Sequence, residues 1–513
     1  MVKRSNIRLF DGAMDTPAPL LDSPLSPPQD GNTLQRQLLR RLKASILDGR
    51  LPAGSRLPAS RALAEQLGIS RNTVLLAYSQ LTAEGYVRAD RQGTWVAFLP
   101  MAPATGINPA ARISLPKPIS PAPMDASAAQ RVSRLIASPR HIEAAVALRP
   151  GTPALSHFPL GAWRRTLDRT LRDMPISTLG YGDPAGEPAL RDAIARHLGL
   201  SRGVRCHAEQ ILITEGAQEA LSLCVRLLSN PGDIAWMEDP GYRGVKAALQ
   251  AGDLQVIPVR VDDEGLAAPA TLWHTHAPRM IYTSPSHQYP TGAVLSAARR
   301  LDLLERARRN NAWIIEDDYD SEFRHQGDPI PAMQGLADNA PVVYIGTFSK
   351  TMFPALRIGF LVLPEGLTGS LHTAVHELLR GGHRHEQLAL AEFMESGQFA
   401  RHLGRMRRLY RDRQSALRSA LARHLSVSHE VLGGQGGLHL TVRLPPEIQD
   451  RQLAAAARQA GMAPSALSAF ALQPTAEDNG LVLGYGNTSA DLFEPLIKRL
   501  TMLIAQTTAR RPA

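Results

Sequence analysis

Short apolar runs alternate with amphipathic stretches through the region from about residue 140 to 513. The clearest runs lie at 211–214, 234–237, 280–283 and 313–316. They have the composition of buried strands, and the stretches between them carry apolar residues at helical spacing. This alternation predicts an α/β domain with a mostly parallel sheet over 140–513.

A different pattern occupies residues 31–98. The predicted elements are helices at 34–47, 61–67 and 71–84, then strands at 86–89 and 94–97 around the turn 90–93. Ser60 and Ser70 can cap the second and third helices, and Gly68 suits the turn between them. This order of elements predicts a helix-turn-helix followed by a wing.

Two further segments show neither pattern. Residues 1–30 are rich in Pro, Ser and Asp, which predicts a disordered tail. Residues 99–139 carry seven prolines before position 124, and prolines at that density exclude a regular helix or a central strand. The sequence therefore predicts a semi-rigid linker over 99–139.

Positive charge is concentrated in residues 31–98. The whole chain has a formal net charge of +10, while this segment holds ten basic and four acidic side chains and so contributes +6. Such a footprint indicates nucleic-acid binding. At the start of the third helix, Arg71, Asn72 and Thr73 can reach base edges or phosphates, and Arg61 is placed for a backbone phosphate. The alternative is a protein-contact domain with solvated arginines.

The composition bears on the cellular compartment in which the protein is expected. No stretch approaches the roughly 20 apolar residues that a membrane span needs, and residues 1–30 lack the apolar core of a secretion signal. Cys206 and Cys224 are the two cysteines, too few for a disulfide framework. These features predict a cytoplasmic protein with no membrane partner.

The run 346–357 carries the most specific chemistry. Lys350 stands among hydroxyl side chains, between apolar strands predicted at 341–345 and 358–362, with Arg357 seven residues downstream. A lysine held by flanking strands can lose its proton through desolvation and attack an aldehyde. The hydroxyls and Arg357 suit a phosphate on the same ligand, which points to pyridoxal 5'-phosphate (PLP). The alternative is a solvated loop lysine.

A PLP site makes demands that other segments can meet. It needs a phosphate cup, an acid at the pyridine nitrogen, a donor to the ring hydroxyl and a stacking group. The candidates are Gly216, Ala217 and Gln218 for the phosphate, Asp317 for the nitrogen, Tyr319 for the hydroxyl and Tyr242 for stacking. Each has a plainer interpretation: a strand-to-helix turn, an acidic surface loop, and a tyrosine that covers the core.

The turn-rich loop 283–292 follows another predicted strand. We expect its His287 and Gln288 to face the ligand rather than a metal. No second His or Cys lies at metal-ligand spacing, and His383 with His385 is too little for a site. No metal site is therefore predicted.

Two sequence segments closely resemble the winged helix of GntR-type bacterial regulators: 51–61, LPAGSRLPASR, and 67–74, LGISRNTV. The resemblance covers essentially all of 31–98. It implies that Arg61, Arg71, Thr73 and the wing glycine Gly93 contact operator DNA.

From about Tyr181 to near the C-terminus the chain resembles a fold-type I, class I aminotransferase, with its motifs in the same order. The resemblance implies that Lys350 forms the Schiff base with PLP. It implies that Thr347, Ser349 and Arg357 bind the phosphate with the backbone of 216–218. Tyr181 would reach across a dimer interface to the partner's phosphate.

One position departs from that family. Its members hold the substrate α-carboxylate with an arginine on a late strand, and Val482 falls where that arginine is expected. No arginine occurs between Arg458 and Arg499. Since a valine cannot pair with a carboxylate, ordinary amino-acid transamination is in doubt.

The combination of parts resembles the MocR subfamily of bacterial regulators, and 283–292 is close to a phrase typical of that group. The implied function is PLP-dependent control of transcription, with PLP or an amino compound as effector and a homodimer, possibly domain-swapped. One alternative is a working aminotransferase with a DNA-binding appendage. Another is a DNA-binding protein whose large domain only dimerises.

Overall fold

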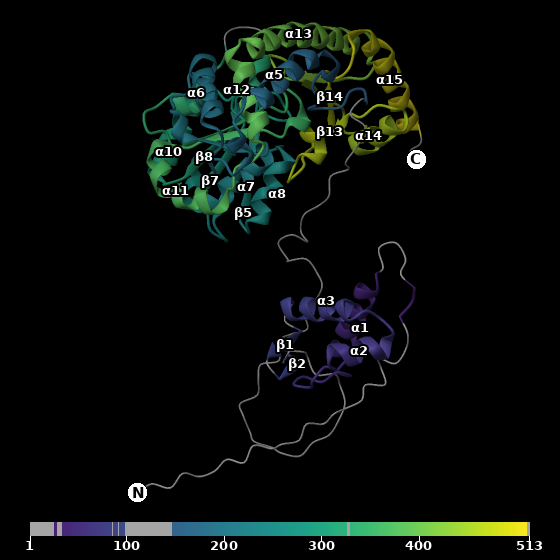
Figure 1. Cartoon of the computed structure of the whole chain (residues 1–513). Helices are drawn as coiled ribbons and strands as arrows, with labels where there is room; N and C mark the ends of the chain where they lie inside the picture. The colour runs from purple at the N-terminus through teal and green to yellow at the C-terminus, as the bar shows by residue number, and fades with distance from the viewer. Residues whose placement is uncertain are drawn as a thin grey trace, which may run out of the picture. The chain divides into compact units, whose positions relative to one another are not determined.

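The computed structural model describes residues 25–27, 33–84, 86–90, 92–97, 146–325 and 329–509. The chain divides into two compact units, 1–124 and 125–513, each of which is described by itself (Figure 1). The linker predicted at 99–139 lies outside the described residues, and so does the tail predicted at 1–30 apart from 25–27.

The smaller unit is a winged helix-turn-helix, as predicted. Its elements are α1 (Leu34–Leu47), α2 (Ser60–Leu67), α3 (Arg71–Ala83), and the antiparallel strands β1 (Val87–Asp90) and β2 (Gly93–Val96). The Ser70 hydroxyl accepts from the Thr73 amide and so caps α3, and Gly68 ends α2 in the left-handed conformation. The expectation that Ser60 caps α2 is wrong: Ser60 is the first helical residue, and Ala59 occupies the cap position without a side-chain bond.

Apolar side chains from all three helices form the core of this unit. Leu38 and Leu42 of α1, Leu63 of α2, and Val74 and Leu81 of α3 are fully buried. Each contributes about 2 kcal/mol to stability through burial. Val87 and Val96 join the same cluster, so the wing is anchored to the helices by its first and last residues.

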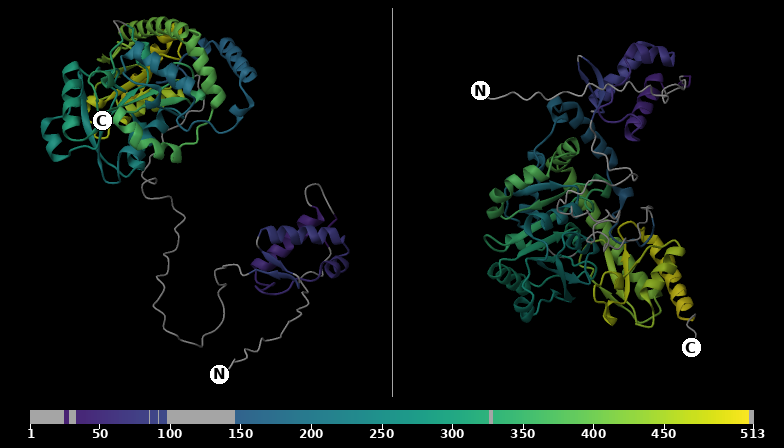
Figure 2. Two further views of the ribbon diagram at one scale, coloured as in Figure 1. Left: turned by 60° about the vertical axis from the view of Figure 1, so that its left-hand side comes forward. Right: turned by 90° about the horizontal axis from the view of Figure 1, so that it is seen from below.

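The larger unit, seen from three sides in Figures 1 and 2, is built on an eight-stranded sheet in the order β3-β10-β9-β8-β7-β4-β5-β6. The strands are β3 (Ile211–Thr214), β4 (Ile234–Asp239), β5 (Gln255–Asp262), β6 (Gly265–Leu266), β7 (Met280–Thr283), β8 (Trp313–Asp318), β9 (Val342–Thr347) and β10 (Gly359–Val362). Neighbours from β9 to β5 are parallel, whereas β10 runs antiparallel to both β9 and β3. The predicted mostly parallel sheet is confirmed.

Helices cover both faces of this sheet because alternate strand residues point to opposite sides. Met237, Tyr282 and Ile315 pack with α7 (Ala217–Leu228), α8 (Arg243–Ala251) and α11 (Glu365–Leu378). Their chain neighbours Trp236, Ile281 and Ile314 pack with α9 (Ala270–Thr275) and α10 (Ala297–Arg309). The strands are thus buried on both faces, which explains their continuous apolar runs.

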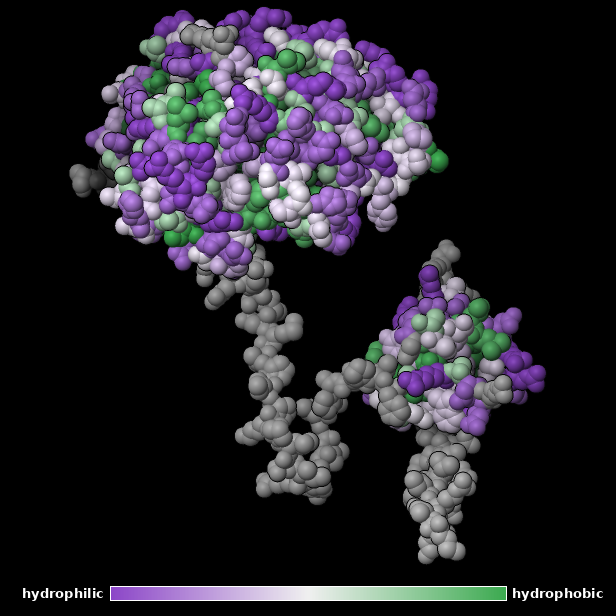
Figure 3. Space-filling view, turned by 90° about the vertical axis from the view of Figure 1, so that its left-hand side faces the viewer, coloured by the Kyte–Doolittle hydropathy of each residue, from purple (hydrophilic) through white to green (hydrophobic). Residues whose placement is uncertain are grey.

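A second sheet and the remaining helices surround a further core. The sheet has the order β11-β12-β14-β13, with β11 (Glu430–Leu432), β12 (His439–Arg443), β13 (Ser465–Ala466) and β14 (Gly480–Gly484). The helices are α5 (Leu160–Asp173), α6 (Pro188–Arg202), α12 (Arg384–Glu395), α13 (Gln398–His424), α14 (Asp450–Gln459) and α15 (Phe493–Ala509). Figure 3 shows that hydrophilic side chains cover most of one face of this unit. Among the described residues, no helix is long and apolar enough to cross a membrane.

Candidate cofactor site and DNA interface

Lys350 lies in the loop that joins β9 to β10. It is half-buried, and its Nζ donates a hydrogen bond to the carbonyl oxygen of Gly151 over 2.6 Å. Burial lowers the pKa of this amine, while the charges of Asp320 and Asp317 oppose that shift. A lysine that loses its proton more easily is a better nucleophile toward an aldehyde.

Asp317 sits near the end of β8 with one carboxylate oxygen free. Its Oδ2 accepts from the Tyr282 hydroxyl over 2.7 Å, whereas Oδ1 is buried and has no hydrogen-bond partner among the described residues. Burial raises the pKa of Asp317 to about 7. A buried oxygen that lacks a donor suits a protonated ring nitrogen, because that cation would both satisfy and stabilise the carboxylate. Asp317 therefore fits the role that the sequence predicts.

Gly216 and Arg357 come together at the start of α7, and Thr347 stands opposite Gly359 of β10, which on its other side stands opposite Thr214. Gly216 has φ +85°, and a Cβ placed on it would lie 3.2 Å from the Arg357 guanidinium. Arg357 is exposed and donates to the Glu215 carbonyl. The Ser349 amide donates to the Thr347 hydroxyl over 3.2 Å. A helix N-terminus, an arginine and two hydroxyls thus form a cup suited to an anion.

Tyr242 comes directly before α8, and the charges of Asp317 and Arg357 both act on its hydroxyl. Burial raises its pKa to about 12, with the Asp317 charge adding to the shift and the Arg357 charge opposing it. Its position near both charges fits a ring that stacks on a ligand reaching from acid to phosphate cup. Ala217 begins α7, and the Gln218 side chain donates to the Gly244 carbonyl over 2.9 Å, which ties α7 to α8.

The loop 283–292 is held from beneath by Glu238. This buried carboxylate accepts from the Thr283 hydroxyl, from both donors of Ser284, and from the Gln288 amide. The Gln288 oxygen in turn accepts from Thr291. The expectation that Gln288 faces the ligand is therefore wrong, because both ends of its amide are used inside this part of the fold.

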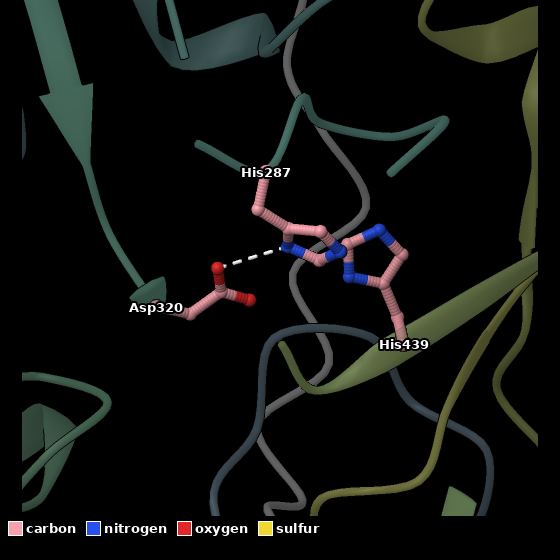
Figure 4. Close-up of side chains that lie close together, drawn as sticks. All are labelled: His287, Asp320 and His439. Atoms are coloured by element: carbon pink, nitrogen blue, oxygen red, sulfur yellow. Dashed lines mark hydrogen bonds and ion pairs between the residues drawn. The ribbon is translucent and has the colours of Figure 1, made fainter. Parts of the chain in front are cut away.

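His287 belongs to a group of buried polar side chains with Asp320 and His439 (Figure 4). Its Nδ1 lies 2.9 Å from Asp320 Oδ1 and 3.0 Å from the Tyr319 hydroxyl. His287, Asp320 and His439 each offer a potential metal-ligating atom within 4.8 Å of the others. Sequence reasoning missed this group because its members come from three distant segments and share no spacing motif.

Val482 faces the same site from the second sheet. It stands directly opposite Thr441, whose hydroxyl donates to the Pro290 carbonyl over 2.5 Å. Opposed residues of an antiparallel pair share one face. Val482 is fully buried there, so the fold places an apolar side chain where the sequence comparison led us to expect an arginine.

Tyr181 is not part of this arrangement within one chain. It is 94% exposed, and the Arg384 guanidinium holds the backbone just before it by donating to the carbonyls of Ser177, Thr178 and Gly180. Arg384 also pairs with Glu187, with Nε 2.5 Å from Oε1. Arg384 thus fixes the segment that displays Tyr181.

The DNA-binding candidates cluster at the helix-turn-helix. Arg61, Arg71 and Asn72 are exposed, and Thr73 is half-buried with its hydroxyl 2.9 Å from the Ser70 hydroxyl. Arg71 Nε lies 3.4 Å from Ser60 Oγ, so the arginine at the start of α3 reaches the first turn of α2. The N-terminal ends of α2 and α3 therefore lie close together, and both carry side-chain hydrogen-bond donors.

The packing of the wing itself explains why position 93 is a glycine. A Cβ on Gly93, with φ +153°, would lie 2.6 Å from Arg56 Nε. Arg56 donates to the Gln92 carbonyl and lies over the Trp95 ring, 5.7 Å from its centroid. Arg56 is an exposed cation on the wing that sequence reasoning did not single out. The sequence signals for it are its place in the segment 51–61 and the presence of a cation and a tryptophan in one small basic domain.

Comparison with known proteins agrees with both halves. Residues 34–96 match the bacterial regulatory proteins of the gntR family, and residues 151–479 match the aminotransferases of class I and II. The crystal structure of Pyrococcus horikoshii kynurenine aminotransferase, in complex with PMP, covers 74% of this chain and 97% of its own. The TM-score is 0.67 and the identity 26%.

Relatives match across both units at once. The chain is 40% identical to the probable rhizopine catabolism regulatory protein MocR of Rhizobium meliloti, over 88% of this chain and 90% of that protein. It is 33% identical to the pyridoxine biosynthesis transcriptional regulator PdxR of Corynebacterium glutamicum, over 94% and 98%. The chain belongs to the MocR subfamily of GntR-type transcriptional regulators, in which a DNA-binding winged helix is joined to a fold-type I aminotransferase domain.

Proposed function

We propose that the larger unit binds PLP through Lys350 and that the state of this site controls operator binding by the winged helix. The observation that carries the proposal is the pairing of a lysine whose pKa is lowered with a buried Asp317 oxygen that has no donor. When bound, PLP supplies an aldehyde that condenses reversibly with primary amines. Lys350 would condense with that aldehyde, and Asp317 would face the ring nitrogen at the other end.

The phosphate would occupy the cup at the start of α7. Arg357, Thr347 and Ser349 offer donors there, together with the backbone at Gly216. Because α7 is a helix of 12 residues with its N-terminus at this point, its dipole adds to the attraction for an anion.

The effector is PLP itself or an amino compound, and Val482 bears on which. A bidentate guanidinium normally discriminates carboxylates strongly, and its absence from β14 argues against ordinary α-amino acids as effectors. The same absence argues against steady transamination. Sensing needs only reversible occupation of the site.

A homodimer is supported by the segment around Tyr181. Ile176 is 82% exposed and Leu179 is 67% exposed, and both stand close to Tyr181 along the chain. Large apolar side chains that are exposed together commonly mark a contact surface. A second copy of the chain would cover them and receive Tyr181 at its phosphate cup.

A spectral titration tests the proposal. Purified chain is titrated with PLP, then with PLP plus amines bearing a carboxylate, a sulfonate or neither, and absorbance and operator binding are recorded together. We expect a PLP band that Lys350→Ala abolishes, and a change in operator affinity with PLP or with one amine. Steady turnover of any amine would favour the aminotransferase, and absence of a PLP band would favour a purely dimerising domain.

A further inference from the structure

One imidazole nitrogen contacts two side chains in the candidate cofactor site. Nδ1 of His287 lies 2.9 Å from Asp320 Oδ1 and 3.0 Å from the Tyr319 hydroxyl oxygen. His287 is 5% exposed and Asp320 is 2% exposed. Solvent therefore does little to decide which of these atoms carries hydrogen, and the partners must decide it.

The carboxylate fixes the hydrogen on Nδ1. An ionised carboxylate only accepts, so the short contact to Asp320 requires Nδ1 to donate. The same hydrogen is then directed toward the phenol oxygen of Tyr319, which becomes an acceptor on that side. The phenol hydrogen cannot also point at Nδ1 and must be donated elsewhere.

The opposite side of the imidazole agrees with this assignment. Within the part of the chain that the structure describes, the buried His287 Nε2 has no hydrogen-bond partner, as expected for a nitrogen that carries only a lone pair. Its neighbour His439 lies with ring centroids 5.0 Å apart and uses its own Nε2 on the Pro290 carbonyl over 3.0 Å. Burial lowers the pKa of His439 to about 3, so this ring is neutral and adds no charge beside His287.

The backbone is shaped around this pair. Gly437 has φ +79°, and a Cβ on it would lie 2.1 Å from His287 Cε1 and 2.6 Å from Asp320 Oδ2. Only glycine tolerates both the conformation and the closeness. The contact between His287 and Asp320 is therefore built into the fold.

We propose that Asp320 and His287 form a positioning dyad that holds Tyr319 as a hydrogen-bond donor toward the ring oxygen of the cofactor. Neither dyad residue needs to touch the cofactor: Asp320 sets the tautomer of His287, and His287 occupies one lone pair of Tyr319. The inference rests on the PLP site proposed above and adds two residues to it.

Asp320 acts on Lys350 as well. Of the charges that favour the protonated lysine, Asp320 has the largest effect and Asp317 the next. One carboxylate thus influences both the phenol and the amine that would flank the cofactor. For this reason the test places the main substitutions at His287, which leaves the charge of Asp320 in place.

The experiment is a pH titration of the absorbance of bound PLP, combined with the Kd for PLP, in full-length protein. The variants are Tyr319→Phe, His287→Leu, His287→Asn and the double variant His287→Leu/Tyr319→Phe. A donated hydrogen bond stabilises an anionic ring oxygen, so its loss raises the pKa of the titration. We expect Tyr319→Phe and His287→Leu to raise it by about one pH unit, a tenfold change in proton affinity.

Asparagine can place an N–H near the position of Nδ1, so His287→Asn should keep the wild-type titration. The double variant should match Tyr319→Phe alone, because His287 acts only through the phenol. Additive shifts would overturn the proposal and assign His287 a direct or merely structural effect. An unshifted titration in His287→Leu would overturn it as well.

Elemental analysis of the same proteins tests whether these side chains bind a metal ion instead. One bound divalent cation per chain, lost in both His287→Leu and His439→Gln, would overturn the dyad and make His287 a metal ligand. Failure of the underlying PLP site is distinguishable, since Lys350→Ala would then leave the spectrum unchanged. Thermal unfolding of the cofactor-free variants confirms that His287→Asn, at least, is folded.

Discussion

Lys350 and Gly151 are joined by a 2.6 Å hydrogen bond from the lysine Nζ to the glycine carbonyl oxygen. The partner is a neutral carbonyl rather than a carboxylate, so no ion pair has to be broken before the amine reacts. A carbonyl can satisfy the amine in either protonation state. This relationship makes Lys350 available to a ligand while it remains hydrogen-bonded.

Substitution of Lys350 should remove covalent capture of PLP. Reduction with borohydride fixes a lysine–PLP adduct that mass spectrometry detects on one peptide. We expect the adduct at Lys350 in the wild type and none in Lys350→Arg, which keeps the charge but cannot condense. Lys498→Ala is the control, because Lys498 is exposed on α15 and pairs there with Glu494. An adduct that persists in Lys350→Arg would contradict the assignment.

Asp317 should make the cofactor-free protein less stable as pH rises. Its pKa is raised from 3.8 to about 7 by burial, so the folded state keeps a proton that the unfolded state has released. Stability therefore falls between about pH 4 and 7, by about 4 kcal/mol at most.

Thermal unfolding across that range checks this prediction. The stability of Asp317→Asn should fall less steeply with pH than that of the wild type. Some slope should remain, because burial also raises the pKa of Glu316 to about 7 and this carboxyl acts in the same direction. Saturating PLP should flatten the wild-type profile, since a cation beside Asp317 favours the ionised form. Equal slopes in wild type and Asp317→Asn would show that this carboxyl ionises normally.

Arg71→Ala should weaken operator binding strongly and leave PLP occupancy unchanged. If Arg71 contacts a base or phosphate, its loss costs about 1–3 kcal/mol, and loss of a phosphate contact lowers the salt slope by about one. Arg40→Ala is a matched control, because Arg40 is an exposed arginine on α1 of the same unit. Fluorescence anisotropy over a salt series measures both the operator affinity and its salt dependence. Equal losses in the two variants would indicate a general charge effect.

Arg384→Ala should weaken dimerisation without unfolding the large unit. Arg384 joins the carbonyls of Ser177, Thr178 and Gly180 to Glu187 and so orders the exposed segment before Tyr181. We expect at least a tenfold rise in the dimer dissociation constant by analytical ultracentrifugation. Arg384→Lys keeps the charge but not the forked geometry, and should be intermediate. An unchanged dissociation constant would place the interface elsewhere.

Much of the fold could be predicted because local pattern and tertiary structure agree. The runs at 211–214 and 280–283 are strands β3 and β7, and the loop with Lys350 lies between two strands as predicted. Ser70 caps α3 because its role depends only on residues within one turn. Such signals are local, and a single sequence carries them.

The contacts inside the site could not be predicted in the same way. Gln288 was expected to face the ligand, yet Glu238, fifty residues earlier, takes its amide. The contact of His287 with Asp320 depends on how β7 and β8 align and on a glycine at 437. Arg384 and the carbonyls before Tyr181 are about two hundred residues apart. Side-chain partners of this kind are decided by packing, which no spacing rule encodes.

Strand β10 determines when, during synthesis, the candidate cofactor site can form. It is inserted between β9 and β3, and Gly359 at its start packs so closely on Gly216 that a Cβ would lie 2.7 Å from the Gly216 backbone. The anion-binding turn and the reactive amine therefore become neighbours only after this strand is in place. A nascent chain cannot complete the site before about residue 362 has left the ribosome. Among the described residues, the core cluster of the DNA-binding unit ends at Val96. This unit can therefore be finished long before that, so a newly made regulator has its output domain before it has its sensor.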